Sequence, residues 1–205
     1  MQVHLKKAEQ HLRSADPVMA QLISTYGPCT LFSENALIHK SKFHALAWAI
    51  INQQLSVASA RSIENKLLKL HNNTEFSVTT ISKLKDEQLA ACGLSRQKIR
   101  YLRTLCTSIR HRELDLETLA QSSDNEVTKT LRALPGIGPW TIDMFLMFSL
   151  GHLDILPLGD LALRKSFNRH YSIARPDHYE EYQQLAEYWC PYRTVASWYL
   201  WASVD

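Results

Sequence analysis

The chain has few of the residues that interrupt helices and none of the patterns that build sheets. Only 6 of its 205 residues are glycine and 7 are proline. No stretch alternates apolar and polar residues for long enough to form a half-buried strand, whereas apolar residues recur at helical spacing almost throughout. The sequence therefore predicts an all-α protein.

Other absences exclude several kinds of site. The four cysteines form no C-x-x-C pair, so neither a zinc site nor an iron–sulfur cluster is indicated, and reduced thiols are expected. The longest apolar stretch, residues 43–51, contains His44 and is too short to span a bilayer. The first residues lack the apolar run of a signal peptide. We therefore expect an intracellular protein with no bound metal and no membrane partner.

The charge balance is mildly basic, with a net charge of +3 and a pI of about 8.6. Such a balance is compatible with a polyanionic partner but does not require one. No linker, repeat or low-complexity tract divides the 205 residues. We therefore expect residues 1–205 to form a single compact unit.

Capping residues and breakers divide this unit into about ten helices joined by short loops. The expected helices cover residues 4–14, 17–26, 43–54, 57–71, 86–92, 96–110, 123–134, 139–150, 160–169, 177–188 and 191–202. Residues 29–40 are the best candidate for an irregular segment or a short strand. This set of helices predicts an all-α architecture.

A glycine turn joins two of these helices at Leu-Pro-Gly-Ile-Gly, residues 134–138. Glycine allows positive φ and leaves no Cβ between the backbone and a ligand. The N–H groups of Gly136, Ile137, Gly138 and Thr141 would converge at the start of the next helix, where the helix dipole favours an anion. We interpret the turn as a phosphate site, although a plain helix–helix turn also uses glycine. Its carbonyls would also suit a monovalent cation, and no other cofactor is expected.

Asp160 follows Leu158-Gly159 and opens another helix, where an N-cap is the ordinary interpretation. Its context changes that interpretation. Residues 134–167 resemble the signature of the helix-hairpin-helix (HhH-GPD) DNA glycosylases, and the chain is similar to a compact form of their 3-methyladenine DNA glycosylase II branch. The resemblance implies a two-lobed helical fold with a cleft between the lobes. It places the hairpin core at about residues 123–150 and lets the N- and C-terminal segments share the second lobe.

The resemblance also implies a mechanism. The matching aspartate of that family is its catalytic acid/base or electrostatic group, so this role falls to Asp160. Relatives that also cut the DNA strand carry a lysine just after the hairpin, which forms a Schiff base with the sugar. Trp140 stands there in this chain, after Pro139. We therefore expect a monofunctional glycosylase that uses water as its final nucleophile.

The resemblance assigns three side chains to a pocket for the flipped base. Trp140 and Trp201 match tryptophans near that base, and Met144 replaces a tyrosine of a relative, which bears on base preference. Tryptophans at helical spacing are more often core residues, and we keep that interpretation for Trp198 and Tyr199.

The segment 53–56, Gln-Gln-Leu-Ser, resembles the part of the family that faces the DNA minor groove. Gln54 or Leu55 is the candidate wedge that fills the gap left by a flipped nucleotide, although these amides could simply finish a helix. The remaining candidate DNA contacts lie at the starts of two helices and are Ser95, Arg96, Lys98 and Arg164. A solvated basic face is the simpler interpretation of these residues.

We thus expect a monomer that acts on double-stranded DNA containing alkylated bases, wherever the DNA is, in a bacterial cytoplasm or nucleoid or in a nucleus. The main hypothesis is release of 3-methyladenine and 7-methylguanine. The alternatives are a glycosylase of the same fold for hypoxanthine or ethenoadenine, a helix-hairpin-helix DNA-binding module without catalysis, and a purely structural helical protein. Salt-dependent DNA binding distinguishes the last of these from the others.

Overall fold

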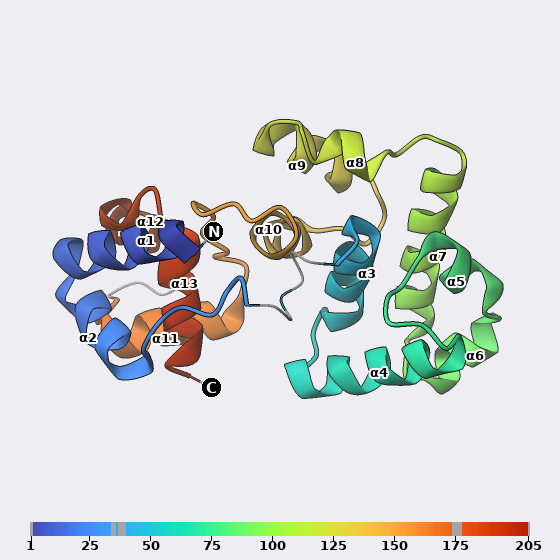
Figure 1. The fold of residues 1–205 in the computed structure, drawn as a ribbon, viewed down its shortest axis with the longest axis horizontal. Coiled ribbons are helices and arrows are strands. Elements are labelled where there is room, and N and C mark those ends of the chain that lie inside the picture. Colours follow the sequence, from blue (N-terminus) through green and yellow to red (C-terminus); the bar gives the residue numbers. More distant parts are fainter. Residues whose placement is uncertain (1, 34–35, 37–39, 174–177, 205) are drawn as a thin grey trace. The chain divides into compact units, whose positions relative to one another are not determined.

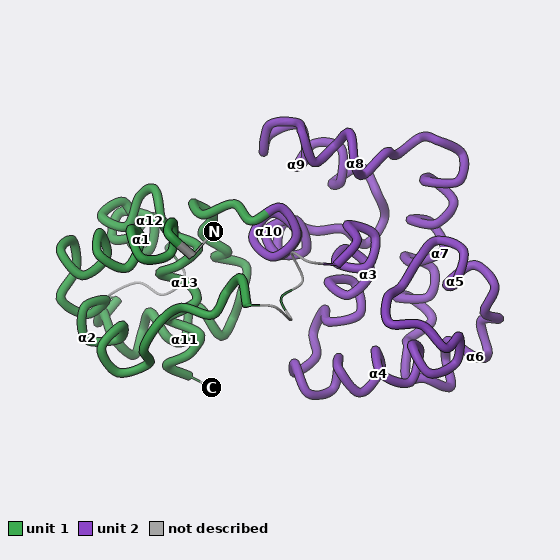
Figure 2. The backbone as a smooth tube through the Cα atoms, in the orientation of Figure 1, with its two compact units in different colours: residues 1–36, 151–205 green, residues 37–150 purple. Residues whose placement is uncertain are grey.

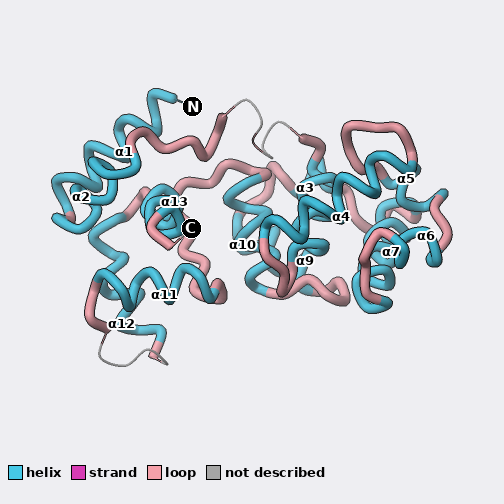
Figure 3. The backbone as a smooth tube through the Cα atoms, turned by 90° about the horizontal axis from the view of Figure 1, so that it is seen from below, coloured by secondary structure: helices cyan, strands magenta, loops and turns pink. Residues whose placement is uncertain are grey.

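A computed structural model gives the fold and describes residues 2–33, 36, 40–173 and 178–204. Every regular element in these residues is a helix, and Figures 1 and 3 show no strand among them. The prediction of an all-α protein is confirmed. The predicted irregular segment 29–40 has turns where it is described, and residues 34–35 and 37–39 lie outside the described part.

The chain forms two compact units (Figure 2). The first unit combines Met1–Ala36 with Gly151–Asp205, and the second unit is Leu37–Leu150. The expectation that residues 1–205 act as one catalytic unit remains a prediction.

The second unit is built around one helix that is apolar on nearly every side. Its helices are α3 (Lys42–Asn52), α4 (Val57–Leu70), α5 (Val78–Lys83), α6 (Asp86–Ala91), α7 (Arg96–Arg110), α8 (Leu116–Leu119), α9 (Asp124–Arg132) and α10 (Pro139–Phe148). Helix α3 contacts α4, α7, α8 and α10. A helix surrounded in this way has no polar face to present to water, which explains its apolar sequence.

The first unit is built from both ends of the chain. It contains α1 (Gln2–Ala15), α2 (Pro17–Tyr26), α11 (Leu161–His170), α12 (Tyr179–Ala186), the 3₁₀ turn η2 (Glu187–Trp189) and α13 (Arg193–Ala202). Buried Asp16 caps α2 and also accepts hydrogen bonds from Tyr171 Oη and Trp189 Nε1, each at 2.8 Å. One carboxylate therefore ties the N-terminal helices to the C-terminal ones.

Most helix starts were predicted correctly because a side-chain cap marks them. Ser56, Ser95 and Ser123 each accept a hydrogen bond from the backbone N–H three residues on. Helix α3 ends at Asn52, so its predicted extension to Gln54 is wrong. Helices α5 and α8, of 6 and 4 residues, were not predicted.

The cysteines are free thiols, as expected. Burial raises the pKa of Cys29 to about 12, which makes this thiol a poor nucleophile at neutral pH. Among the described residues, no helix is long and apolar enough to cross a membrane.

Candidate active site

The predicted glycine turn lies between α9 and α10 in the second unit. The Ile137 amide donates to the Leu134 carbonyl at 3.2 Å and closes the turn, while the Ile137 side chain is buried. Gly138 then caps α10 with no side-chain hydrogen bond. The Ile137 amide is thus engaged within the turn, contrary to the prediction that it faces a phosphate. The amides of Gly136 and Gly138 make no hydrogen bond to the described part of the chain.

The two glycines of the turn differ in what surrounds them. Gly136 has φ +84°, and a Cβ built on it would lie 2.1 Å from Cδ2 of Tyr101, on α7. A Cβ on Gly138 would meet nothing within 4 Å. Gly136 is therefore required by the fold. Gly138 leaves open the space through which an anion would approach the N-terminus of α10.

Thr141 lies in the first turn of α10 and is buried. Its hydroxyl accepts a hydrogen bond from Gln53 Nε2 at 2.9 Å. The side chain therefore faces the interior of the second unit, and only its backbone amide remains as a candidate DNA contact.

The predicted wedge lies in the loop between α3 and α4. Gln54 and Leu55 are both exposed, and Gln54 has φ 56°, a left-handed conformation that non-glycine residues rarely adopt. Val57, at the start of α4, leaves 51% of its surface exposed. The loop therefore presents apolar and amide side chains to solvent, as a wedge requires.

Lys98 contacts this loop rather than solvent. Its Nζ donates to the carbonyls of Ile51 and Gln53 at 2.7 and 2.8 Å, and burial lowers its pKa. These carbonyls belong to the end of α3, where a cation is favoured. Lys98 therefore does not extend outward as the predicted phosphate contact would. Arg96 is exposed, as that prediction requires, and exposed Ser95 caps α7.

Asp160 caps α11 in the first unit. The turn before it is closed by a hydrogen bond from the Asp160 amide to the Pro157 carbonyl at 2.9 Å. Its Oδ1 accepts from the Leu163 amide at 2.8 Å and from Trp201 Nε1 at 3.1 Å. Two N–H donors on one oxygen hold the carboxylate in a single orientation. The N-cap and catalytic interpretations of Asp160 are therefore compatible.

The segment that leads to Asp160 is held by the start of α13. Arg193 pairs with Asp154 through two N–O distances of 2.8 Å. Thr194 Oγ1 donates to the His152 carbonyl at 2.8 Å and accepts from the Ile155 amide at 3.0 Å. The same helix carries Trp201 near its other end, so α13 fixes both the approach to Asp160 and one of its hydrogen bonds.

Arg164 also supports this loop. Its guanidinium donates to the Leu158 carbonyl and lies 5.6 Å from the centre of the Tyr179 ring. These contacts hold the residues just before Asp160. Arg164 was predicted to contact DNA; the side chain that the structure describes holds the loop before Asp160 instead.

The other pocket candidates lie on α10. Trp140 is partly exposed and Met144 is buried. Asp143, which the sequence analysis did not single out, follows Trp140 by about one turn, and burial raises its pKa to about 7. Helix α10 therefore carries a carboxyl that titrates near neutral pH next to an aromatic candidate.

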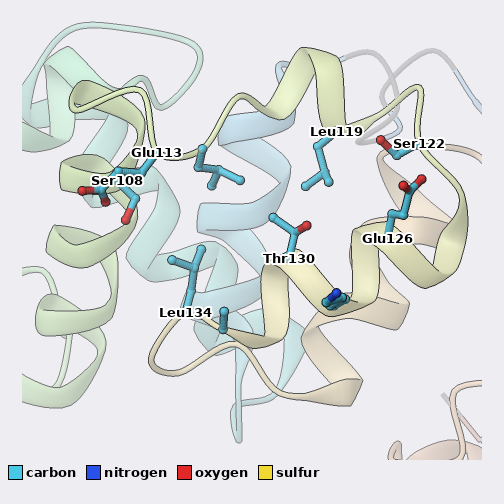
Figure 4. A pocket seen from close by; sticks show the side chains of 10 residues that line it. Ser108, Glu113, Leu119, Ser122, Glu126, Thr130 and Leu134 are labelled. Atoms are coloured by element: carbon cyan, nitrogen blue, oxygen red, sulfur yellow. The ribbon is translucent and has the colours of Figure 1, made fainter.

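A separate pocket of about 570 Å³ opens in the second unit between the end of α7 and helices α8 and α9 (Figure 4). It is lined by Ser108, Glu113, Leu114, Leu119, Ser122, Glu126, Lys129, Thr130, Ala133 and Leu134. None of the predicted pocket or catalytic residues line it. This pocket is therefore not the predicted base pocket. Glu126 in its lining is engaged with Ser123 at the start of α9.

Sequence reasoning missed contacts that join distant parts of the chain. Gln53, Tyr101 and Arg193 bind or pack against the site residues but carry no local signal of that role. The described residues contain no group of three or more His, Cys, Asp or Glu that could hold a metal ion.

The chain is similar to known proteins in sequence and in fold. The sequence model of the HhH-GPD superfamily base excision DNA repair proteins matches residues 47–191. The chain is 31% identical over 199 residues to the alkylbase DNA glycosidase-like protein mag2 of Schizosaccharomyces pombe, covering 96% of this chain and 92% of that protein. It is 29% identical to the DNA-3-methyladenine glycosylase 1 of the same organism, covering 96% of this chain and 86% of that protein.

A solved structure is also similar. The S. pombe 3-methyladenine DNA glycosylase Mag1, in complex with abasic DNA, superimposes with a TM-score of 0.85 at 29% identity, covering 96% of each chain. The similarity therefore extends over both units.

The surroundings of the two hairpin glycines predict different effects of the same substitution. Gly136→Ala should lower the free energy of unfolding by about 2 kcal/mol or more, because the Cβ adds strain at positive φ and overlaps the Tyr101 ring. Gly138→Ala should change stability by less than about 1 kcal/mol but weaken DNA binding. Denaturant unfolding and fluorescence anisotropy measure the two effects. A Gly138→Ala protein with wild-type DNA affinity would contradict the phosphate role of the turn.

The contacts of Lys98 predict how DNA binding depends on salt. Lys98→Met should leave the slope of log affinity against log salt unchanged, since the ammonium group is engaged by carbonyls. Arg96→Ala should reduce that slope by about 1 if Arg96 contacts a phosphate. Titrations at several salt concentrations with both variants test this. A reduced slope for Lys98→Met would mean that the ammonium group turns towards the DNA.

Proposed function

The chain belongs to the HhH-GPD superfamily of base excision DNA repair proteins, and we propose that it is a monofunctional DNA glycosylase for alkylated purines. It would hydrolyse the N-glycosidic bond of bases such as 3-methyladenine and 7-methylguanine in duplex DNA. The observation that carries this proposal is the Asp160 carboxylate, oriented by the Leu163 amide and the Trp201 indole. Relatives named as 3-methyladenine glycosylases support the choice of substrate.

The first part of the proposed reaction is binding and extrusion of the damaged base. The open N-terminus of α10 beside Gly138 would bind a DNA phosphate without reading the sequence. The exposed loop at Gln54 and Leu55 would fill the gap left in the duplex. Trp140 and Trp201 would stack against the extruded base, because an alkylated purine is electron-poor and an indole ring is electron-rich.

The second part is cleavage of the bond between the sugar C1′ and the base nitrogen. Positive charge develops on the sugar as this bond breaks, and a nearby carboxylate stabilises that charge. Asp160 would supply this anion and orient the water whose oxygen adds to C1′, with the water proton passing to the carboxylate or solvent. A cationic alkylated base leaves with the bonding electrons and needs no general acid.

The monofunctional part of the proposal depends on one position. Trp140 stands where strand-cutting relatives carry the lysine that forms a Schiff base with C1′. An indole has no amine for that reaction. The product would therefore be an intact strand with an abasic site. No cofactor takes part in this scheme; a monovalent cation at the hairpin carbonyls would act only on DNA binding.

Asp160→Asn should strongly reduce the rate of catalysis while leaving DNA binding in place, because the amide keeps the size of the side chain and removes its charge. We expect release of methylpurines from methylated duplex DNA to fall by at least about 100-fold, the size of a lost electrostatic or acid–base contribution. Chromatography of released bases measures this, and strand breaks are counted before and after alkali.

Equal release by wild type and Asp160→Asn would exclude Asp160 as the catalytic group. Strand breaks before alkali would exclude monofunctional hydrolysis. If neither protein releases methylpurines but both bind DNA, the same assay with hypoxanthine and ethenoadenine distinguishes another base specificity from a binding module.

A further inference from the structure

Gln53 connects the loop that carries the proposed wedge with the glycine turn that is proposed to bind a phosphate. Its Nε2 donates to the Gly136 carbonyl at 2.7 Å and to Thr141 Oγ1 at 2.9 Å. Gly136 lies in the glycine turn, and Thr141 lies in the first turn of α10. The side chain of one residue therefore ties the loop after α3 to the glycine turn and to the helix that follows it.

The main chain of Gln53 is fixed as well. Its carbonyl accepts a hydrogen bond from Lys98 Nζ at 2.8 Å, and the same ammonium group binds the Ile51 carbonyl at 2.7 Å. The Leu55 amide in turn donates to the Asn52 carbonyl at 3.1 Å. The backbone is thereby held by α7 on one side, while the Gln53 side chain is held by the hairpin on the other.

These contacts surround the strained residue of the loop. Gln54 has φ 56°, and a non-glycine residue in that region costs about 1–2 kcal/mol. Such a conformation persists only where neighbouring contacts determine it. Gln53 precedes it directly and is anchored through both its side chain and its carbonyl. Gln54 itself is exposed and makes no hydrogen bond to the described residues.

We propose that Gln53 is a positioning residue that fixes the Gln54–Leu55 wedge at a set offset from the phosphate-binding hairpin. When the hairpin binds the DNA backbone, the wedge is then placed at the base stack at the same time. The inference depends on the proposed function for the meaning of the wedge, but its geometric part concerns only the second unit.

Anchoring on a phosphate and insertion at a base need a rigid link between them. A hairpin on a phosphate holds the duplex backbone but exerts no force on a base. A loop free to move would give way instead of displacing a stacked nucleotide, and a misplacement of about 1 Å can cost 100-fold in rate. The link must therefore be short and fixed, as two hydrogen bonds from one amide are.

The test replaces the amide without changing its size or charge. Gln53→Met keeps the length of the side chain and loses both donors. Gln10→Met, on an exposed face of α1, is the matched control. Wedge insertion is followed by the fluorescence of 2-aminopurine next to a tetrahydrofuran abasic analogue, which requires no catalysis. Affinity for undamaged duplex and single-turnover release of methylpurines are measured with the same proteins.

We expect Gln53→Met to bind undamaged duplex within about twofold of wild type. The rate of the 2-aminopurine response and the rate of base release should both fall about tenfold, the effect of about 1.4 kcal/mol. Hydrogen exchange of the free protein should rise at residues 53–56. Unchanged insertion and release would overturn the proposal. An equal loss of affinity for undamaged DNA would also overturn it, because Gln53 would then support the hairpin alone.

A second variant keeps the test decisive if Gln53→Met does not fold. Gln53→Glu loses the donors when ionised but regains one O–H donor when protonated. Its insertion rate relative to wild type should therefore rise as the pH falls. A ratio that does not change with pH would contradict the proposal. A wild-type protein that inserts but releases no base would refute the proposed function and leave the role of Gln53 intact.

Discussion

The hydrogen bonds to Asp160 Oδ1 are the interactions on which the proposed chemistry depends. One comes from the Leu163 amide at the start of α11, and the other comes from Trp201 on α13. Residues distant in sequence thus meet at one oxygen. The contacts of Arg193 with Asp154 and of Arg164 with the Leu158 carbonyl hold the segment that carries this carboxylate. Much of the first unit can be understood as support for the orientation of one side chain.

In the second unit, the proposed phosphate site and wedge are also held in place by side chains from other helices and loops. A phosphate site needs free amides, and a wedge needs exposed side chains, so neither can be stabilised by its own burial. The Tyr101 ring packs against Gly136, and Gln53 and Lys98 hold the backbone of the loop. Side chains that would not face the DNA therefore set the positions of the groups proposed to contact it.

The sequence alone predicted the features that depend on local chemistry. Helix starts at Ser56, Ser95 and Ser123, the glycine turn and the cap at Asp160 all have signals within a few residues. The roles of Gln53, Lys98 and Arg164 could not be predicted in the same way. An amide or a basic side chain looks the same in sequence whether it faces solvent, DNA or a carbonyl 83 residues away, as for Gln53 and Gly136. Only the fold decides which partner it meets.

The most direct test of the account is the single-turnover rate of base release by Trp201→Phe. Phenylalanine keeps an aromatic face and removes the N–H donor to Asp160. The rate should fall by about tenfold or more, as expected for the loss of one hydrogen bond to a charged group. Affinity for abasic DNA and thermal stability should stay close to those of the wild type. A wild-type rate in this variant would contradict the claim that Trp201 orients the catalytic carboxylate.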